Sequence, residues 1–408
     1  MRTPTPMLFT HFGDNWLRGS ERCLLDLLTH LDRDSFQPVV WCNSPLMAEA
    51  VKALSVPVVQ SRFPVLLGWQ APRFDVRGYR QLLAEGQQLI EQYQIELLHA
   101  NSAAPCQWLV PLARRNRIPV LVHLHARYLL RDRLSLRLHG VDLAVGVSQP
   151  VVEGLLADGL PDYRVTVVPN GIDVARLEAQ APSALRERFG IPAQAPLLAA
   201  VGSLIARKGI DLLLHALHRV HEAGFAAHLL VIGEGPERAN LERLSDRLGL
   251  NQCVHFVGEY SEPAGLLRSG VDMLVSGARE EVFGLVLAEG GCMGLPVVAP
   301  RVGGIAEVIE HGKTGVLVAP NSAQTLAEGI LTLLQHPERA KAMGEAGRLR
   351  VHKRFTAQAN AHAIQDCYRR LLLGGHARER ATSGLLTRWL MRSLRQRLTG
   401  HVLADQWL

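Results

Sequence analysis

Short apolar runs alternate with amphipathic stretches along the first half of the chain. Residues 6–12 (PMLFTHF) and 36–42 (FQPVVWC) are nearly continuous apolar segments, whereas residues 20–31 place cysteine and leucine side chains at helical spacing on one face. The further strands that this pattern predicts are 56–61, 95–102, 119–125 and 142–148, with a second helix at 79–93. Buried strands separated by helices are typical of a parallel sheet covered on both faces. The first half is therefore predicted to be an α/β unit.

The same alternation begins again after a turn and a polar connecting stretch. Residues 165–173 (VTVVPNGID) end the first half in a turn, and the segment 175–196 is predicted to connect two domains with one short helix. The strands predicted beyond it are 196–203, 227–235, 253–259, 272–277, 295–300 and 315–320. Residues 327–355 are predicted to be helical, and Thr356 to cap a further helix. Two Rossmann-like units in tandem follow, and ligands are expected at the carboxyl ends of their strands, in the cleft between them.

Length and composition agree with two globular domains. A chain of 408 residues exceeds the usual size of a single core, and 48% hydrophobic with 20% charged residues excludes a disordered chain. No apolar run reaches membrane-spanning length, and the N-terminus lacks a signal-peptide pattern, so a cytoplasmic protein is expected. The six cysteines show no CxxC spacing and are expected to be buried, reduced thiols.

Most of the net charge of +6 lies in the last 35 residues. From Gly374 onward there are six arginines and two acidic residues, a net charge of +4, so the remaining chain is close to neutral and a general nucleic-acid binder is not indicated. Residues 378–398 place leucine and tryptophan along one side of a helix and arginines mostly elsewhere. A basic amphipathic helix of this kind either rests on an anionic membrane or packs on the protein, and both alternatives remain open.

Two acidic residues bracket an otherwise uncharged segment in the second half. Glu281 follows the strand 272–277, and Glu289 lies in the helix that leaves this loop. The NH groups of the first turn, about Phe283 to Val286, are expected to bind an anion or hydroxyl groups. The two carboxylates can accept hydrogen bonds from paired hydroxyls such as those of a sugar or a ribose. The alternative is that Glu281 only caps the helix and Glu289 faces water.

Two adjacent cations follow the strand 196–203. Arg207 and Lys208 precede a helix, and two positive charges at a helix N-terminus suit a diphosphate. Gly209 next to them permits close backbone approach. A second glycine-rich loop at Gly233 follows the next strand, although a βα turn of this kind is weak evidence alone.

These segments together resemble a known enzyme family. The motifs VVPNGID, VGSLIARKGIDLLLHAL, VIGEGPE, VHFVGE, EVFGLVLAE and GLPVVAPRVGGIAEVIEHGKTGVLV follow one another from residue 165 to 318. They resemble the nucleotide-sugar-binding domain of retaining glycosyltransferases of family 4, and the resemblance is looser over the first half. It implies an α/β chain of the GT-B fold, with two Rossmann-like domains facing a central cleft. The implied domains are 1–175 for the acceptor, 176–355 for the nucleotide sugar, and 356–408 as helices that cross back to the N-terminal domain and end in the basic tail.

The resemblance implies roles for the residues that match its motifs. Arg207 and Lys208 would hold the diphosphate and stabilise it as the leaving group. Glu289 would bind the ribose hydroxyls, and Glu281 the hydroxyls of the transferred sugar. The remaining donor-binding positions implied in this way are Gly202, Gly233, Val257, Tyr260, Phe283, Gly284 and Leu285.

The first half supplies one further catalytic candidate. His125 ends the strand 119–125, where the family has a histidine that contacts the donor sugar near the reacting centre. His123 shares its strand face by the period of two. A metal pair formed by these histidines is not favoured, because no cysteine or carboxylate ligands accompany them.

The acceptor candidates follow the first strand. Family members have a Gly-Gly loop here, and this chain has Gly19-Ser20 in its place, so close backbone approach is in doubt. Ser20 is expected to cap the helix and to contact an acceptor hydroxyl or phosphate. Asp14 and Asn15, in the preceding polar loop, are expected to contact the acceptor as well.

The function implied is transfer of a glycosyl group from a nucleoside diphosphate sugar to an acceptor hydroxyl with retention of configuration. No metal ion or other cofactor is expected, because cations and helix NH groups would stabilise the leaving diphosphate. The partners implied are the donor, a glycan or lipid-linked acceptor, and an anionic membrane surface reached through the tail. Bacterial surface-polysaccharide or glycolipid synthesis, on the inner face of the cytoplasmic membrane, is expected from the family. The alternatives are a non-catalytic nucleotide-sugar-binding protein and a nucleotide-sugar epimerase of the same fold.

Overall fold

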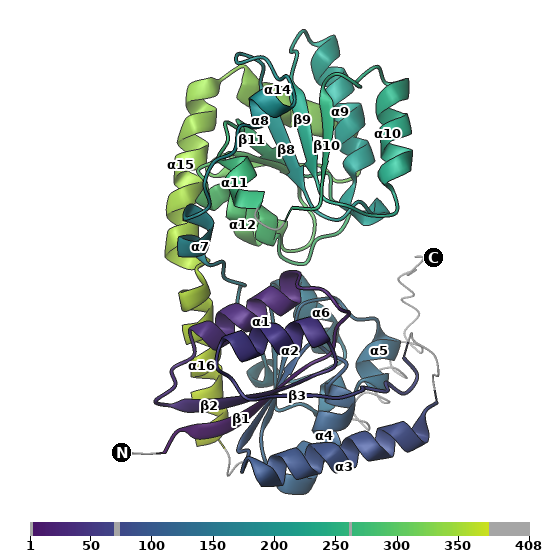
Figure 1. Cartoon of the computed structure of the whole chain (residues 1–408), viewed down its shortest axis with the longest axis vertical. Helices are drawn as coiled ribbons and strands as arrows, with labels where there is room; N and C mark the ends of the chain where they lie inside the picture. Colours follow the sequence, from purple (N-terminus) through teal and green to yellow (C-terminus); the bar gives the residue numbers. More distant parts are fainter. Residues whose placement is uncertain (1–2, 69–73, 261–262, 375–408) are drawn as a thin grey trace, which may run out of the picture. The chain divides into compact units, whose positions relative to one another are not determined.

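The computed structural model describes residues 3–68, 74–260 and 263–374, so the basic tail predicted after Gly374 lies outside the described residues. The chain divides into two compact units (Figure 1). Of the described residues, the first unit contains those up to Val168 and residues 362–374, and the second contains those within Pro169–Ala361. Within the described ranges, no helix is long and apolar enough to cross a membrane.

The first unit is built on a parallel sheet. Its described strands follow the order β3-β2-β1-β4-β5-β6-β7. They are β1 (Thr5–His11), β2 (Phe36–Cys42), β3 (Val58–Gln60), β4 (Leu97–Asn101), β5 (Val120–Leu124), β6 (Leu143–Gly146) and β7 (Val165–Val167). Pro38 is tolerated in β2 because β3 pairs with this strand only from Val40 onward, so the proline lies in a part of β2 with one partner strand.

Helices connect these strands, as parallel pairing requires. They are α1 (Gly19–Thr29), α2 (Pro45–Ala53), α3 (Val76–Gln92), α4 (Cys106–Asn116), α5 (Leu130–Ser135) and α6 (Gln149–Ala157), with short 3-10 turns η1 (Leu138–Gly140) and η2 (Asp162–Arg164). Part of the core is aromatic, since the ring of Trp41 lies 5.0 Å from that of Phe63 and 6.3 Å from that of Trp108.

The second unit repeats this architecture. Its described strands form a parallel sheet in the order β10-β9-β8-β11-β12-β13. They are β8 (Leu197–Val201), β9 (His228–Ile232), β10 (Val254–Gly258), β11 (Met273–Val275), β12 (Val297–Pro300) and β13 (Gly315–Val318). The predicted pair of Rossmann-like α/β sheets is thus confirmed.

The helices of the second unit differ from the predictions in two places. They are α7 (Val174–Glu178), α8 (Leu185–Arg188), η3 (Ala206–Lys208), α9 (Ile210–Glu222), α10 (Arg238–Arg247), α11 (Pro263–Leu267), α12 (Leu285–Cys292), α13 (Ile305–Val308), α14 (Ala323–Leu334) and α15 (Pro337–Arg354). The connecting stretch holds two short helices rather than one, because Asp173 caps α7 and α8 then buries Leu185. The predicted helix 327–355 is interrupted, because Pro337 cannot continue α14 and instead begins α15.

The last described helix belongs to both units. Thr356 caps α16 (Ala357–Leu373) as predicted, since its Oγ1 accepts a hydrogen bond of 3.1 Å from the NH of Ala359. The chain passes from the second unit to the first between Ala361 and His362, inside this helix. In the first unit Tyr368 is fully buried, and its hydroxyl lies 2.7 Å from Nδ1 of His99 in β4.

Both strand orders contain a point where the direction of winding reverses. This switch lies between β1 and β4 in the first unit and between β8 and β11 in the second. Helices that follow the two switch strands leave toward opposite faces of the sheet, so the carboxyl ends of these strands are left uncovered by a crossover. Each unit therefore has one preferred place for polar and ligand-binding groups.

Candidate functional site

A small pocket lies at the switch point of the second unit. Its volume is about 30 Å³, and it is lined by the ends of β8 and β11, by Lys208 and Glu281, and by the beginning of α12. Gly284 and Val286 supply the helix part of the lining. The structure thus brings together one predicted diphosphate ligand and one predicted sugar ligand.

Lys208 and Glu281 form an ion pair in this pocket. The distance from Lys208 Nζ to Glu281 Oε2 is 2.6 Å, and the two side chains are 22% and 15% exposed. The other carboxylate oxygen accepts a 3.1 Å hydrogen bond from the NH of Val282. Glu281 does not occupy the N-cap position of α12, which is Gly284. A partly buried pair of this kind is strongly interdependent, since removal of one charge leaves the other poorly solvated.

The helix that begins beside the pair offers backbone donors. The NH groups of Leu285 and Val286 lie in the first turn of α12, where no residue of the helix can accept from them. Phe283 cannot offer its side chain, because the ring is buried against Phe355 at 5.8 Å. Glu289 is half-buried further along α12 and is not part of the pocket lining.

Glycines hold the loops of the pocket against one another. A Cβ on Gly209 would lie 1.9 Å from the carbonyl oxygen of Gly277, and a Cβ on Gly277 would lie 2.1 Å from that of Gly209. A Cβ on Gly303 would lie 1.8 Å from the carbonyl oxygen of Glu281. These backbone contacts position the segments that contain Lys208 and Glu281, so two glycines of the motifs, Gly209 and Gly303, have a packing role.

Further positions predicted to bind the donor lie near one another in the structure. The NH of Gly233 donates a 2.8 Å hydrogen bond to the carbonyl oxygen of Gly258, at the end of β10. A Cβ on Gly233 would lie 2.0 Å from the carbonyl oxygen of Gly202. Val257 is half-buried in β10, and Tyr260 is 41% exposed beyond it.

Arg207 has different surroundings from Lys208. Its side chain is exposed and is not part of the pocket lining, whereas its carbonyl oxygen accepts a 2.8 Å hydrogen bond from the NH of Arg279. The structure therefore places one of the two predicted cations in the pocket and the other in solvent.

A buried polar network lies at the switch point of the first unit. His11 ends β1 directly opposite Asn101, which ends β4. His11 Nε2 lies 3.0 Å from Glu21 Oε1, with side chains that are 1% and 4% exposed. Asn101 Oδ1 lies 3.1 Å from Nε2 of His125, which follows β5. His125 was predicted from the sequence, but its three partners were not, although polar residues at the ends of both switch strands were a usable signal.

The hydrogen bonds of Asn101 define the tautomer of His125. Asn101 Nδ2 lies 3.2 Å from the carbonyl oxygen of Ser20, which only accepts, so this atom is the amide nitrogen. Oδ1 then faces His125, and His125 Nε2 must donate to it. Burial and the nearby His123 and His11 hold the pKa of His125 well below its usual value, so the ring is neutral at pH 7 with Nδ1 as an acceptor.

Glu21 anchors the other end of the network as a carboxylate. Burial alone raises its pKa, but the hydrogen bond and charge of His11 and the NH of Arg18 outweigh burial, and the pKa lies below its usual value. Ser20 does not cap α1, and that prediction was wrong, since the helix begins at Gly19 with Arg18 as N-cap residue. The Ser20 hydroxyl instead donates a 3.1 Å hydrogen bond to Glu21.

The other acceptor candidates are exposed. Asp14, Asn15 and Gly19 lie on the surface of the first unit. Asn15 Oδ1 accepts hydrogen bonds from the Ser44 hydroxyl at 3.1 Å and from the NH of Leu46 at 3.2 Å, so it helps to cap α2.

The comparisons with known families cover most of the chain. The family described as Glycosyltransferase Family 4 matches residues 17–176, and the family described as Glycosyl transferases group 1 matches residues 183–350. Over 278 residues the chain is 31% identical to the GDP-mannose-dependent alpha-(1-6)-phosphatidylinositol monomannoside mannosyltransferase of Mycolicibacterium smegmatis, covering 64% of this chain and 72% of the relative. It is 25% identical over 311 residues to the N-acetyl-alpha-D-glucosaminyl L-malate synthase of Bacillus anthracis, and this match covers 74% of this chain and 80% of the relative.

Solved structures agree on the fold. Anabaena HepE in complex with UDP and glucose superimposes with a TM-score of 0.75 at 22% identity, covering 89% of this chain and 99% of that protein. WaaG, a glycosyltransferase involved in lipopolysaccharide biosynthesis, gives a TM-score of 0.67 at 19% identity, and the match covers 88% of this chain and 99% of WaaG. Each of the two units is thus a Rossmann-like unit of the GT-B fold. Family matches over both halves and a relative above 30% identity lead to one conclusion: the chain belongs to the family 4, or group 1, glycosyltransferases and uses a nucleotide-sugar donor.

Proposed function

We propose that this enzyme transfers a hexose with retention of configuration to a hydroxyl of a glycolipid or glycan acceptor in bacterial cell-surface synthesis. Several similar relatives are named as mannosyltransferases that act on phosphatidylinositol mannosides, which supports a lipid-linked acceptor. The observation on which the proposal rests is the Lys208–Glu281 pair beside the N-terminus of α12.

On the donor side, the pair is proposed to exchange its partners when substrate binds. Lys208 Nζ would leave Glu281 for the β-phosphate, and Glu281 would accept hydrogen bonds from hydroxyls of the sugar. Negative charge grows on the diphosphate as the glycosidic bond breaks, and Lys208 together with the NH groups of Leu285 and Val286 would stabilise it. Arg207 and Glu289 remain proposed ligands of the diphosphate and the ribose.

His125 is proposed to act as a neutral acceptor. Its Nε2–H is committed to Asn101, so Nδ1 is the atom left for a substrate hydroxyl. A histidine held this way cannot serve as an acid at pH 7, because burial lowers its pKa. The network of Asn101, His11 and Glu21 is proposed to position the ring rather than to react.

The donor is tested by binding and turnover together. Thermal-shift measurements with GDP-mannose, UDP-glucose, UDP-N-acetylglucosamine and ADP-glucose should show stabilisation by one nucleotide class. The preferred donor should then be consumed in the presence of EDTA, and NMR of the product should show the anomeric configuration of the donor. Stabilisation by no donor, or consumption only with added metal ions, would contradict the proposal.

Peripheral membrane attachment is proposed for the tail, on its sequence pattern alone. Co-sedimentation with vesicles containing phosphatidylglycerol should require residues 375–408. Equal sedimentation of the full chain and of a chain ending at Gly374 would favour the alternative, in which the tail packs on the protein.

A further inference from the structure

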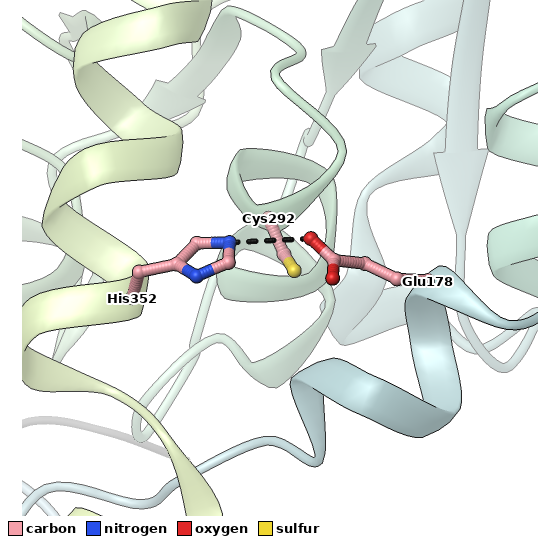
Figure 2. Close-up of side chains that lie close together, drawn as sticks. All are labelled: Glu178, Cys292 and His352. Atoms are coloured by element: carbon pink, nitrogen blue, oxygen red, sulfur yellow. Dashed lines mark ion pairs between the residues drawn. The ribbon is translucent and has the colours of Figure 1, made fainter.

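Three side chains of different chemistry meet away from the pocket, in the second unit (Figure 2). Glu178 is the last residue of α7, Cys292 is the last residue of α12, and His352 lies in the last turn of α15. Their ligand atoms all lie within 4.8 Å of one another, and His352 Nε2 is 3.3 Å from Glu178 Oε1. Figure 2 shows the Cys292 side chain between the imidazole and the carboxylate.

The combination of donors matches one class of ion. A thiolate, an imidazole and a carboxylate are ligands that Zn²⁺ accepts, whereas Mg²⁺ and Ca²⁺ prefer oxygen alone. Metal–ligand distances of about 2.0–2.3 Å give a tetrahedron with edges of about 3.5 Å, so the ligand atoms need to move by only about 1 Å. Glu178 and His352 are 47% and 36% exposed and are free to make this adjustment, while Cys292 is fixed in the core.

The backbone around the cluster favours a positive charge as well. Helices α12 and α15 direct their carboxyl ends toward it, and the C-terminus of a helix has a partial negative charge. The carbonyl of Glu178 at the end of α7 already accepts a hydrogen bond from Arg268 Nη1, so α7 adds little. The effect comes mainly from the longest of them, α15. Side-chain chemistry and backbone polarity therefore agree on a cation.

We propose that Glu178, Cys292 and His352 bind a borderline-soft divalent cation such as Zn²⁺, with water as a fourth ligand. Burial raises the pKa of the Cys292 thiol to about 12, so the thiol is protonated without metal. On binding, the sulfur–metal bond forms and the thiol proton passes to solvent, with no change of oxidation state. The ion would cross-link α7, α15 and the carboxyl end of α12, the helix that begins at the donor pocket. Lys208 and Glu281 are not among the ligands, so the ion is not proposed to contact the donor.

The test uses Co²⁺ as a spectroscopic substitute for Zn²⁺ on the full chain after treatment with a chelator. A cobalt–thiolate bond gives near-ultraviolet charge-transfer absorption, which we expect in the wild type and not in C292S. H352Q and E178Q change exposed side chains and should fold normally, with affinity for Co²⁺ reduced at least about tenfold. Zn²⁺ should displace Co²⁺ and raise the melting temperature of the wild type but not of H352Q.

The matched control is C253S, which removes a half-buried thiol of the same unit outside the cluster. It should retain the absorption and the response to Zn²⁺. The proposal is overturned if the wild type shows no charge-transfer absorption, or if H352Q and E178Q bind Co²⁺ as tightly as the wild type. Because absorption and melting are the readouts, the result is independent of the donor and of transfer activity.

Discussion

At the scale of single residues, the ion pair in the pocket makes Lys208 and Glu281 depend on each other. Lys208→Met removes the cation proposed to stabilise the leaving diphosphate, and we expect turnover to fall by about a hundredfold or more, about 3 kcal/mol in the barrier. Initial rates with the preferred donor measure this. The substitution should also lower the melting temperature slightly, because it leaves the Glu281 carboxylate, which is only 15% exposed, without its ion-pair partner.

The control for this change is Lys313→Met, which removes an exposed lysine whose only described ion-pair partner is on the surface. It should leave both turnover and melting temperature unchanged. Normal turnover in Lys208→Met would contradict the proposal that Lys208 stabilises the leaving diphosphate.

Asn101 tests the positioning of His125. Asn101→Leu removes the acceptor for His125 Nε2, so the ring loses its orientation and its single tautomer. We expect kcat to fall at least about tenfold with little change in KM. The pH profile should also change, because the network no longer fixes which nitrogen bears the proton.

A merely structural role for Asn101 would lower the melting temperature without altering the pH profile. Asn116→Leu is the control. This amide lies at the end of α4, before β5 begins, and pairs with Gln87, whereas His125 follows the other end of β5. An unchanged profile in Asn101→Leu would contradict the positioning role.

At the scale of elements, reciprocal glycine contacts hold the loop before α9 against the loop after β11. Gly209→Ala places a Cβ 1.9 Å from a backbone oxygen at φ +62, and we expect it to lower the free energy of unfolding by several kcal/mol. Chemical denaturation measures the change. Gly224→Ala is the control, because Gly224 has φ +88 with no atom within 4 Å and should cost only about 1 kcal/mol. Equal losses of unfolding free energy in the two variants would show that the positive φ, rather than the close contact with Gly277, is the reason that Gly209 must be glycine.

The elements themselves were largely predictable from the sequence. Buried parallel strands such as β8 and β12 are purely apolar. These apolar runs and the turns between them indicate the order of strands and helices. Helix ends were less predictable, because the interruption before Pro337 and the cap of α1 depend on single residues. Ser20 is a favoured capping residue by type, yet Arg18 precedes the helix and the Glu21 side chain accepts its NH at 3.1 Å.

The candidate site was predictable only in part. Lys208 and Glu281 were predicted from motifs in adjacent loops, but their contact depends on how β8 and β11 pair, which no local pattern contains. The network of His11, Asn101 and Glu21 joins residues up to 90 positions apart, so only the fold brings it together.

At the scale of the whole molecule, buried neutral histidines make the first unit sensitive to acid. Burial lowers the pKa of both His99 and His123 from 6.5 to about 3. Between these pH values the unfolded chain binds protons that the folded unit excludes. The free energy of unfolding should therefore decrease as the pH falls through this window, by up to about 1.4 kcal/mol per pH unit for each histidine.

His123→Gln removes one of these groups and should flatten the dependence of melting temperature on pH between 7 and 4. Its Nε2 has no hydrogen-bond partner among the described residues, so the variant loses no such bond at this atom. His218→Gln, at a side chain that is 42% exposed, should leave the slope as in the wild type. If the melting temperature of His123→Gln depends on pH as steeply as that of the wild type, the proposed contribution of buried His123 is wrong.

The crossing within α16 has a consequence for synthesis on the ribosome. The sheet of the first unit is translated early, but Tyr368, which covers His99, is added only after all of the second unit has been made. Until then Phe9 and Phe36, whose rings contact Tyr368, would lack this cover, and transiently exposed apolar surface of this kind promotes aggregation. A frameshift or stop codon late in the gene would thus damage the fold of the part that was translated first.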